Sequence, residues 1–126
     1  MLKNSVLLLL LLTGCVRTTA RHVVSNANNW TVKFTPTPDK IPLNDVFEIT
    51  SWVSGHGTVD SLRVDAAMPT HGHGMMTIPE TTKQPDGSFV TTGMLLHMPG
   101  DWEIYFDIRY EDDIIERAQV PLHLKP

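Results

Sequence analysis

The stretch Trp102-Glu103-Ile104-Tyr105-Phe106-Asp107-Ile108-Arg109 decides the fold class of this chain. Its even-numbered residues are apolar, and its odd-numbered residues are charged or carry a hydroxyl group. Successive side chains of a β-strand point to opposite faces, so this alternation predicts a strand with one face against a core. The run Ser61–Ala66 alternates in the same way, with Leu62, Val64 and Ala66 on its apolar face.

The chain beyond residue 29 has the pattern of further short strands separated by turns rich in proline, glycine and acidic residues. Strands are predicted at Trp30–Thr35, Asp45–Val53, Phe89–Met98 and Ala118–Leu124, with a short one near Met76–Pro79. No stretch of twelve residues combines helical periodicity with helix caps. About seven strands in residues 30–126 predict one all-β domain. We expect an immunoglobulin-like antiparallel β-sandwich, with Trp52 and Trp102 as candidates for its centre. The parity of Trp52 conflicts with that of Phe47 and Ile49, so the alternatives for Trp52 are a bulge in its strand or a partly exposed ring.

The N-terminus has the pattern of an export signal. Lys3 precedes the apolar run Val6–Leu12, which is too short for a permanent membrane-spanning helix. The following Leu12-Thr13-Gly14-Cys15 resembles the lipobox of bacterial lipoproteins, which implies cleavage before Cys15 and acylation of that residue. We therefore expect a lipoprotein signal peptide at residues 1–14, and a lipidated N-terminus with a flexible tether at residues 15–29.

Acylation would hold the protein on a membrane of the cell envelope, facing the periplasm or the exterior. Val16 follows Cys15, which favours the outer membrane in bacteria that have two membranes. Cys15 is the only cysteine, so neither an internal disulfide nor a thiolate ligand is expected in the folded domain.

Charge and motif content argue against several classes of function. The formal net charge is −4, and loss of residues 1–14 removes Lys3 and no acidic residue, which leaves −5. A mildly acidic chain without a run of basic residues is a poor candidate for binding nucleic acid or anionic lipid headgroups. No serine is paired with a plausible base, and there is no phosphate loop, HExxH or CxxC motif. We therefore do not expect an enzyme.

Histidine and methionine are concentrated in two places. The segment Met68-Pro69-Thr70-His71-Gly72-His73-Gly74-Met75-Met76 combines two imidazoles with three thioethers. A second group, Met94, His97 and Met98, comes just before a Pro-Gly turn. Nitrogen and soft-sulfur donors together suit copper, especially Cu(I), better than a hard cation.

The direction of the strands predicts where these two groups lie. Antiparallel strands joined by short turns alternate in direction, which places both groups at the end of the sandwich farthest from the tether. This inference needs the short strand near Met76–Pro79, because without it every later strand would reverse. His123 would lie at the same end of the sandwich and add a third source of possible metal ligands. His56 would lie at the opposite end.

Ordinary structural roles also fit these residues. Met68 continues an apolar stripe and Met94 lies in a predicted strand, so either side chain could belong to the core. His71 and His73 could shape a loop by hydrogen bonding to backbone carbonyls. His22 and His56 are expected to be solvated.

The segments Ala67–Met75 and Met98-Pro99-Gly100-Asp101-Trp102-Glu103, with the Pro-Asp-Gly turn between them, resemble the YtkA-like family and its FixH-like neighbours. The resemblance covers essentially Trp30–Lys125. It implies a small exported β-sandwich. FixH-type members are implied in assembly of copper-containing respiratory oxidases, although they usually carry a transmembrane helix in place of a lipobox.

Two functions from different classes remain open. The first is a lipid-anchored copper chaperone or buffer that passes Cu(I) to an acceptor protein. Its expected ligands are His71, His73, Met75 and Met98, with His97 and Met68 next. The second is a metal-free interaction module whose methionine-rich end docks on a membrane protein, such as a respiratory oxidase-type complex under assembly. A carbohydrate-binding or adhesin-like sandwich is disfavoured because no aromatic platform is evident.

Overall fold

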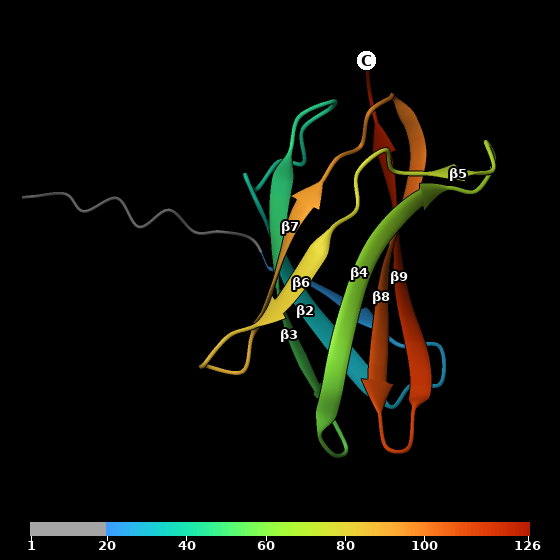
Figure 1. Cartoon of the computed structure of the whole chain (residues 1–126). Coiled ribbons are helices and arrows are strands. Elements are labelled where there is room, and N and C mark those ends of the chain that lie inside the picture. The colour runs from blue at the N-terminus through green and yellow to red at the C-terminus, as the bar shows by residue number, and fades with distance from the viewer. Residues whose placement is uncertain (1–19) are drawn as a thin grey trace, which may run out of the picture.

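The structure is a computed structural model that describes residues 20–126 (Figure 1). Its strands are β1 (Arg21–Val24), β2 (Trp30–Thr37), β3 (Phe47–Gly55), β4 (Val59–Met68), β5 (His73–Gly74), β6 (Glu80–Lys83), β7 (Phe89–Met94), β8 (Gly100–Tyr110) and β9 (Ile114–Leu124). Within these residues no helix is long and apolar enough to cross a membrane. The predicted all-β class is confirmed.

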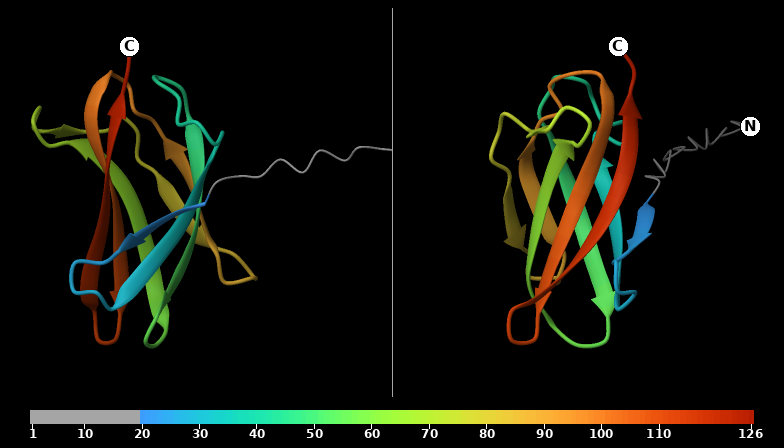
Figure 2. Two further views of the ribbon diagram at one scale, coloured as in Figure 1. Left: turned by 180° about the vertical axis from the view of Figure 1, so that it is seen from behind. Right: turned by 90° about the vertical axis from the view of Figure 1, so that its right-hand side faces the viewer.

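Two antiparallel sheets pack face to face. One sheet has the order β1-β2-β3-β7-β6, and the other has the order β5-β4-β8-β9. Figure 2 shows the two layers from behind and from the side, with β9 running beside the β1–β2 edge of the first sheet. The predicted antiparallel sandwich is therefore present, with two more strands than we expected.

The core follows the predicted alternation. All four even-numbered residues of the Trp102–Ile108 stretch are at most 1% exposed. Ile104, Phe106 and Ile108 lie directly opposite three buried residues of β4, which are Ala66, Val64 and Leu62. Phe34, Phe47 and Ile49 supply the opposite sheet's contribution. Each large side chain buried in this way stabilises the fold by roughly 1.5–3 kcal/mol, so the sandwich is held together without a disulfide.

Of the alternatives for Trp52, the structure shows the exposed ring and not a place at the centre of the core. Trp52 is 39% exposed, because Phe47, Ile49 and Ser51 take the inward positions of β3 and a strand alternates at period two. Lys33 lies over the outward-facing Trp52 ring at 5.3 Å from its centroid. Trp30, which we did not single out, is 2% exposed and fills the core beside Tyr110.

The predicted tether is too long. Residues 21–24 form β1, which pairs with β2 from Arg21 opposite Phe34 to Val24 opposite Thr31. This strand is only four residues long and carries an exposed His22, so its alternation was too short to recognise. The domain therefore begins before residue 30. The predicted signal peptide and Cys15 lie outside the described residues.

The predicted strand near Met76–Pro79 is also wrong. Residues 75–79 cross from β5 in one sheet to β6 in the other, and Pro79 has no N–H to give a strand ladder. The Thr77 hydroxyl instead donates to the Gly93 carbonyl at 2.6 Å. The four residues of β6 take over the role of the missing strand, so the directions of β7, β8 and β9 are as predicted. The predicted distance from the tether is wrong, because β1 runs antiparallel to β2 and its first residue, Arg21, lies towards the end of the sandwich that carries the histidines.

A buried carboxylate fastens the N-terminal hairpin to the second sheet. Glu116 is 4% exposed and accepts hydrogen bonds from Ser25 Oγ at 2.6 Å, from Asn29 Nδ2 at 2.5 Å and from the Tyr110 hydroxyl. Burial alone would raise the pKa of Glu116, but these three hydrogen bonds outweigh it and hold the pKa below its ordinary value. The ionised carboxylate therefore stabilises the fold above the ordinary carboxyl pKa. That stabilisation is lost as the pH falls through the lowered, folded-state pKa.

We predict that Glu116→Gln lowers the free energy of unfolding at pH 7 by about 1–3 kcal/mol, because a neutral amide accepts weaker hydrogen bonds and adds donors that have no partner. The deficit should shrink as the pH falls below the ordinary carboxyl pKa, because protonation of the wild-type carboxyl, first in the unfolded chain and then in the folded one, removes the advantage of the charge. Urea unfolding at several pH values measures this. Glu80→Gln, at an exposed carboxylate, is the control, and a deficit that stays constant from pH 7 to pH 3 would contradict the account.

Candidate metal-binding site

The β4–β5 hairpin carries the first histidine and methionine group. Its turn is closed by backbone hydrogen bonds from His71 and Gly72 to the Met68 carbonyl, both 3.0 Å long. Gly72 has a φ of +68°, a conformation that glycine adopts without the cost of a Cβ clash. The turn brings the chain back so that His73 pairs with Met68 and Gly74 with Ala67.

This register decides where the His73 ring points. Residues directly opposite each other in an antiparallel pair lie on the same face of the sheet, and Met68 is fully buried. His73 is therefore turned towards the core side, above Met68, and it is only partly exposed.

The β7–β8 connection, residues 95–99, brings in the second group. Leu96 is fully buried, and its carbonyl accepts a hydrogen bond from the Asn44 N–H at 2.8 Å. The buried indole of Trp102 donates from Nε1 to the Met98 carbonyl at 2.9 Å. The connection is thus fixed at both sides of His97, at the same end of the sandwich as the β4–β5 hairpin.

Three imidazoles and one indole gather at this end. The centroid of the His73 ring lies 5.7 Å from that of His71 and 5.4 Å from that of His97. The Trp102 ring lies 6.1 Å from His73 and 5.4 Å from His97, edge to face in both pairs. His97 therefore belongs with His73 at the centre of the group, whereas we had ranked it second.

The polar atoms of the two central rings differ in their hydrogen bonding. His73 Nδ1 lies 3.0 Å from the Gly74 carbonyl, so it donates there when protonated and leaves Nε2 with its lone pair. A bond from the second ring nitrogen to a carbonyl is the arrangement that orients histidine ligands in metal sites. His97 Nδ1 is buried and has no hydrogen-bond partner among residues 20–126.

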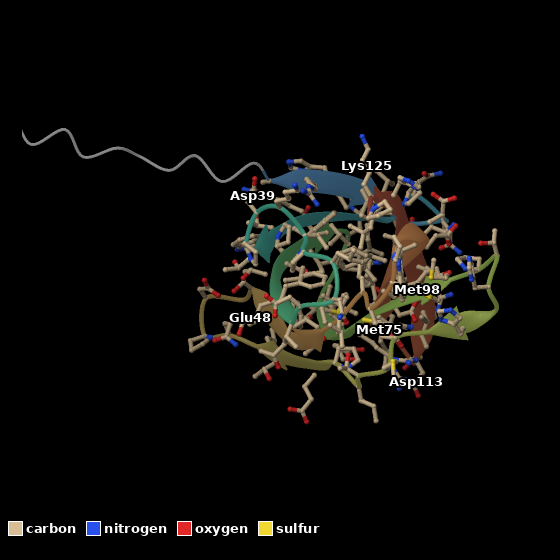
Figure 3. All side chains as sticks on the ribbon, turned by 90° about the horizontal axis from the view of Figure 1, so that it is seen from above. Asp39, Glu48, Met75, Met98, Asp113 and Lys125 are labelled. Atoms are coloured by element: carbon tan, nitrogen blue, oxygen red, sulfur yellow. The ribbon has the colours of Figure 1, made fainter. Side chains whose placement is uncertain are left out.

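The methionines divide into three kinds. Met68 and Met94 are fully buried in the hydrophobic core, as one of our two interpretations predicted. Met75 and Met98 are partly buried against that core, and Figure 3 shows both on the same side of the sandwich end. The Met75 sulfur lies 3.4 Å from the backbone N–H of Leu95. Met76 is 78% exposed.

The remaining histidines stand apart from this group. His123 reaches the same end of the fold, but its Nδ1 lies 2.6 Å from an Asp101 carboxylate oxygen on the neighbouring strand. His22 and His56 are exposed, as expected. Among the described residues no three side chains of His, Cys, Asp or Glu are already arranged as a metal site. This set of four residue types does not include methionine, whose thioether sulfur would also be a ligand for an ion bound here.

Trp102 is the site residue that sequence reasoning did not identify, since we assigned it to the core alone. Its position directly after the Pro99-Gly100 turn, four residues from Met98, was the available signal. Comparison of the chain with protein-family models, with curated proteins and with solved structures gives no match.

We predict that Gly100→Ala destabilises the fold by about 1 kcal/mol more than Gly87→Ala does. Both glycines have a positive φ, +124° and +87°, so both substitutions strain the backbone. A Cβ on Gly100 would also lie 2.9 Å from the Met68 methyl carbon, whereas one on Gly87 meets nothing within 4 Å. Urea unfolding compares the two. Equal decreases in the free energy of unfolding for the two variants would show that the Met68 side chain moves aside without cost.

Proposed function

We propose that this protein is a copper-binding protein, and that it holds Cu(I) between the His73 and His97 rings with thioether sulfur as a further donor. The observation that carries the proposal is the buried, unpartnered Nδ1 of His97 beside His73. A buried polar atom without a hydrogen bond costs roughly 1–3 kcal/mol, and coordination of an ion would remove that cost.

The choice of Cu(I) rests on the donors at this end of the fold. The His73 ring contacts those of His71 and His97, and His73 and His97 both contact Trp102. Met75 and Met98 add partly buried sulfurs. Imidazole and thioether ligands favour a soft ion over Mg²⁺ or Ca²⁺. Met68 and Met94 stay in the core and are not part of the proposed set.

The cellular location proposed for copper binding is inferred from the sequence. A lipid on Cys15 would keep the domain in the cell envelope, where it would act as a copper chaperone or buffer. The resemblance to YtkA-like and FixH-like proteins supports the same setting. We propose binding and not catalysis because the sequence has no serine paired with a plausible base and no phosphate-loop, HExxH or CxxC motif.

We predict that one equivalent of Cu(I) binds to the mature protein in the presence of a competing chelator, and that His73→Ala/His97→Ala weakens binding at least tenfold. Neutral imidazoles are the proposed ligands, so affinity should also fall at acid pH, where protons compete with the metal. Bound copper should quench Trp102 fluorescence. His22→Ala/His56→Ala is the matched control, and equal affinities for the two double variants would reject the site.

A specific observation also favours the metal-free alternative. Met76 is 78% exposed and Ile78 is 93% exposed, on the segment that crosses between the sheets beside the histidine group. Neighbouring exposed apolar side chains of this size are typical of protein contact surfaces. In this alternative the segment docks on a membrane protein, such as a respiratory oxidase-type complex under assembly.

The two functions predict different responses to substitution. If the apolar segment is the functional surface, Met76→Ser/Ile78→Ser abolishes binding to a purified oxidase-type partner with and without Cu(I), and leaves Cu(I) affinity unchanged. Val24→Ser/Ile115→Ser, at exposed apolar side chains elsewhere, is the control. Partner binding that requires Cu(I) and survives the Met76 and Ile78 substitutions would count against this alternative.

A further inference from the structure

A second feature of this end of the fold lies outside the histidine group. A cleft of about 770 Å³ opens between the β2–β3 loop and the last residues of β9. Its walls are apolar, with Ile41, Leu43 and Leu122 among the lining side chains. Three cations, Arg21, Lys40 and Lys125, surround these apolar residues. They come from three distant parts of the chain, so the sequence shows no basic run where the fold makes a basic cleft.

The cations of the cleft form no ion pair, unlike the other arginines of residues 20–126 and like Lys33 and Lys83. Arg63, Arg109 and Arg117 each lie within 3.0 Å of an aspartate oxygen. Among residues 20–126, neither Arg21, Lys40 nor Lys125 forms an ion pair.

Acidic groups at the cleft offset part of this charge, because the C-terminal residue Pro126 also lines it, but they form no ion pair with the three cations. Arg21 donates to the backbone carbonyl of Asp39 at 3.1 Å, which satisfies a hydrogen bond without neutralising the charge. The Asp39 side chain and the C-terminal carboxylate of Pro126 are nearby in the chain, but neither is paired with the three cations. His123 also lines the cleft and is occupied by Asp101. With three cations and one terminal carboxylate in its lining, the cleft carries a net positive charge in a chain that is acidic as a whole.

The chain enters the domain at this cleft. Arg21 is both a lining residue and the first residue of β1. Cys15 precedes it by six residues, which span at most about 20 Å when fully extended. A lipid on Cys15 would therefore hold the cleft close to the membrane surface, where the attraction of anionic headgroups for Lys and Arg acts within a Debye length of about 10 Å.

We propose that this cleft is the face on which the domain lies against an anionic membrane, with Arg21, Lys40 and Lys125 contacting lipid phosphates. The proposal rests on the lipid anchor at Cys15 and is independent of metal binding. Seen from above in Figure 3, Lys125 lies towards one side of the sandwich end, and Met75 and Met98 lie towards another. Docking by the cleft thus leaves the histidine and methionine group open to a partner.

The only cysteine allows a direct test. A chain beginning at Cys15 contains both sheets, and its thiol can be coupled to a maleimide lipid in vesicles, in place of the acyl anchor. A water-soluble acetylating reagent then modifies accessible lysines, and mass spectrometry gives the rate at each one. Lys83, on β6 at the opposite edge of the sheet from β1, is the internal reference.

On vesicles containing phosphatidylglycerol we expect acetylation of Lys40 and Lys125 to slow severalfold relative to Lys83. The protection should disappear on pure phosphatidylcholine vesicles and in 1 M salt. Arg21→Gln should reduce the docked population about fivefold, the effect of one cation near a charged surface. Arg109→Gln removes one charge at the far end of the fold and should leave the protection unchanged.

Three results would overturn the proposal. One is equal acetylation rates for Lys40, Lys125 and Lys83 on anionic vesicles. Another is equal protection on neutral and anionic vesicles, which would show that charge is not the cause. The third is protection of Lys40 and Lys125 by inorganic phosphate without vesicles and to the same extent, which would make the cleft a site for a free anion.

Discussion

The burial of the Trp102 indole at one end of the sandwich is the constraint on which the candidate site depends. The ring is 1% exposed, and its N–H is used by the Met98 carbonyl, so the β7–β8 connection is held against the core. His73 and His97 reach the indole from two connections that are distant in sequence, and both pack edge to face against it. The rigid indole ring thus brings two imidazoles together at this end of the sandwich.

The parts of the fold that could be predicted from sequence are those where one alternation runs long enough to dominate. β8 and β4 are such strands, and their inward residues are all buried. β1 could not be recognised from sequence because its four residues are too few to show a clear alternation. The large aromatic ring of Trp52 suggests burial, but the alternation of its own strand places the ring on the outer face. The crossing at residues 75–79 was mistaken for a strand because its apolar residues suggest burial, whereas Met76 and Ile78 are exposed.

The candidate site shows the same division. Strand direction alone predicted that the His71–Met75 and His97–Met98 groups would meet. The prediction holds because β6 provides the strand of reversed direction that was expected at Met76–Pro79. The ranking within the site could not be predicted, since the burial of Met68 and the unpartnered nitrogen of His97 depend on three-dimensional packing. The basic cleft was likewise hidden, because Arg21, Lys40 and Lys125 are separated in the chain and adjacent only in the fold. The proposed membrane face and the proposed metal site therefore follow from one arrangement of loops at one end.

X-ray absorption spectroscopy of the protein loaded with one equivalent of Cu(I) tests the central claim most directly. The account predicts a first coordination shell that contains both imidazole nitrogen and thioether sulfur, with the sulfur contribution reduced by Met98→Leu and kept in Met94→Leu. A shell of light atoms alone, or a copper signal that is the same after His73 and His97 are both replaced, would contradict it.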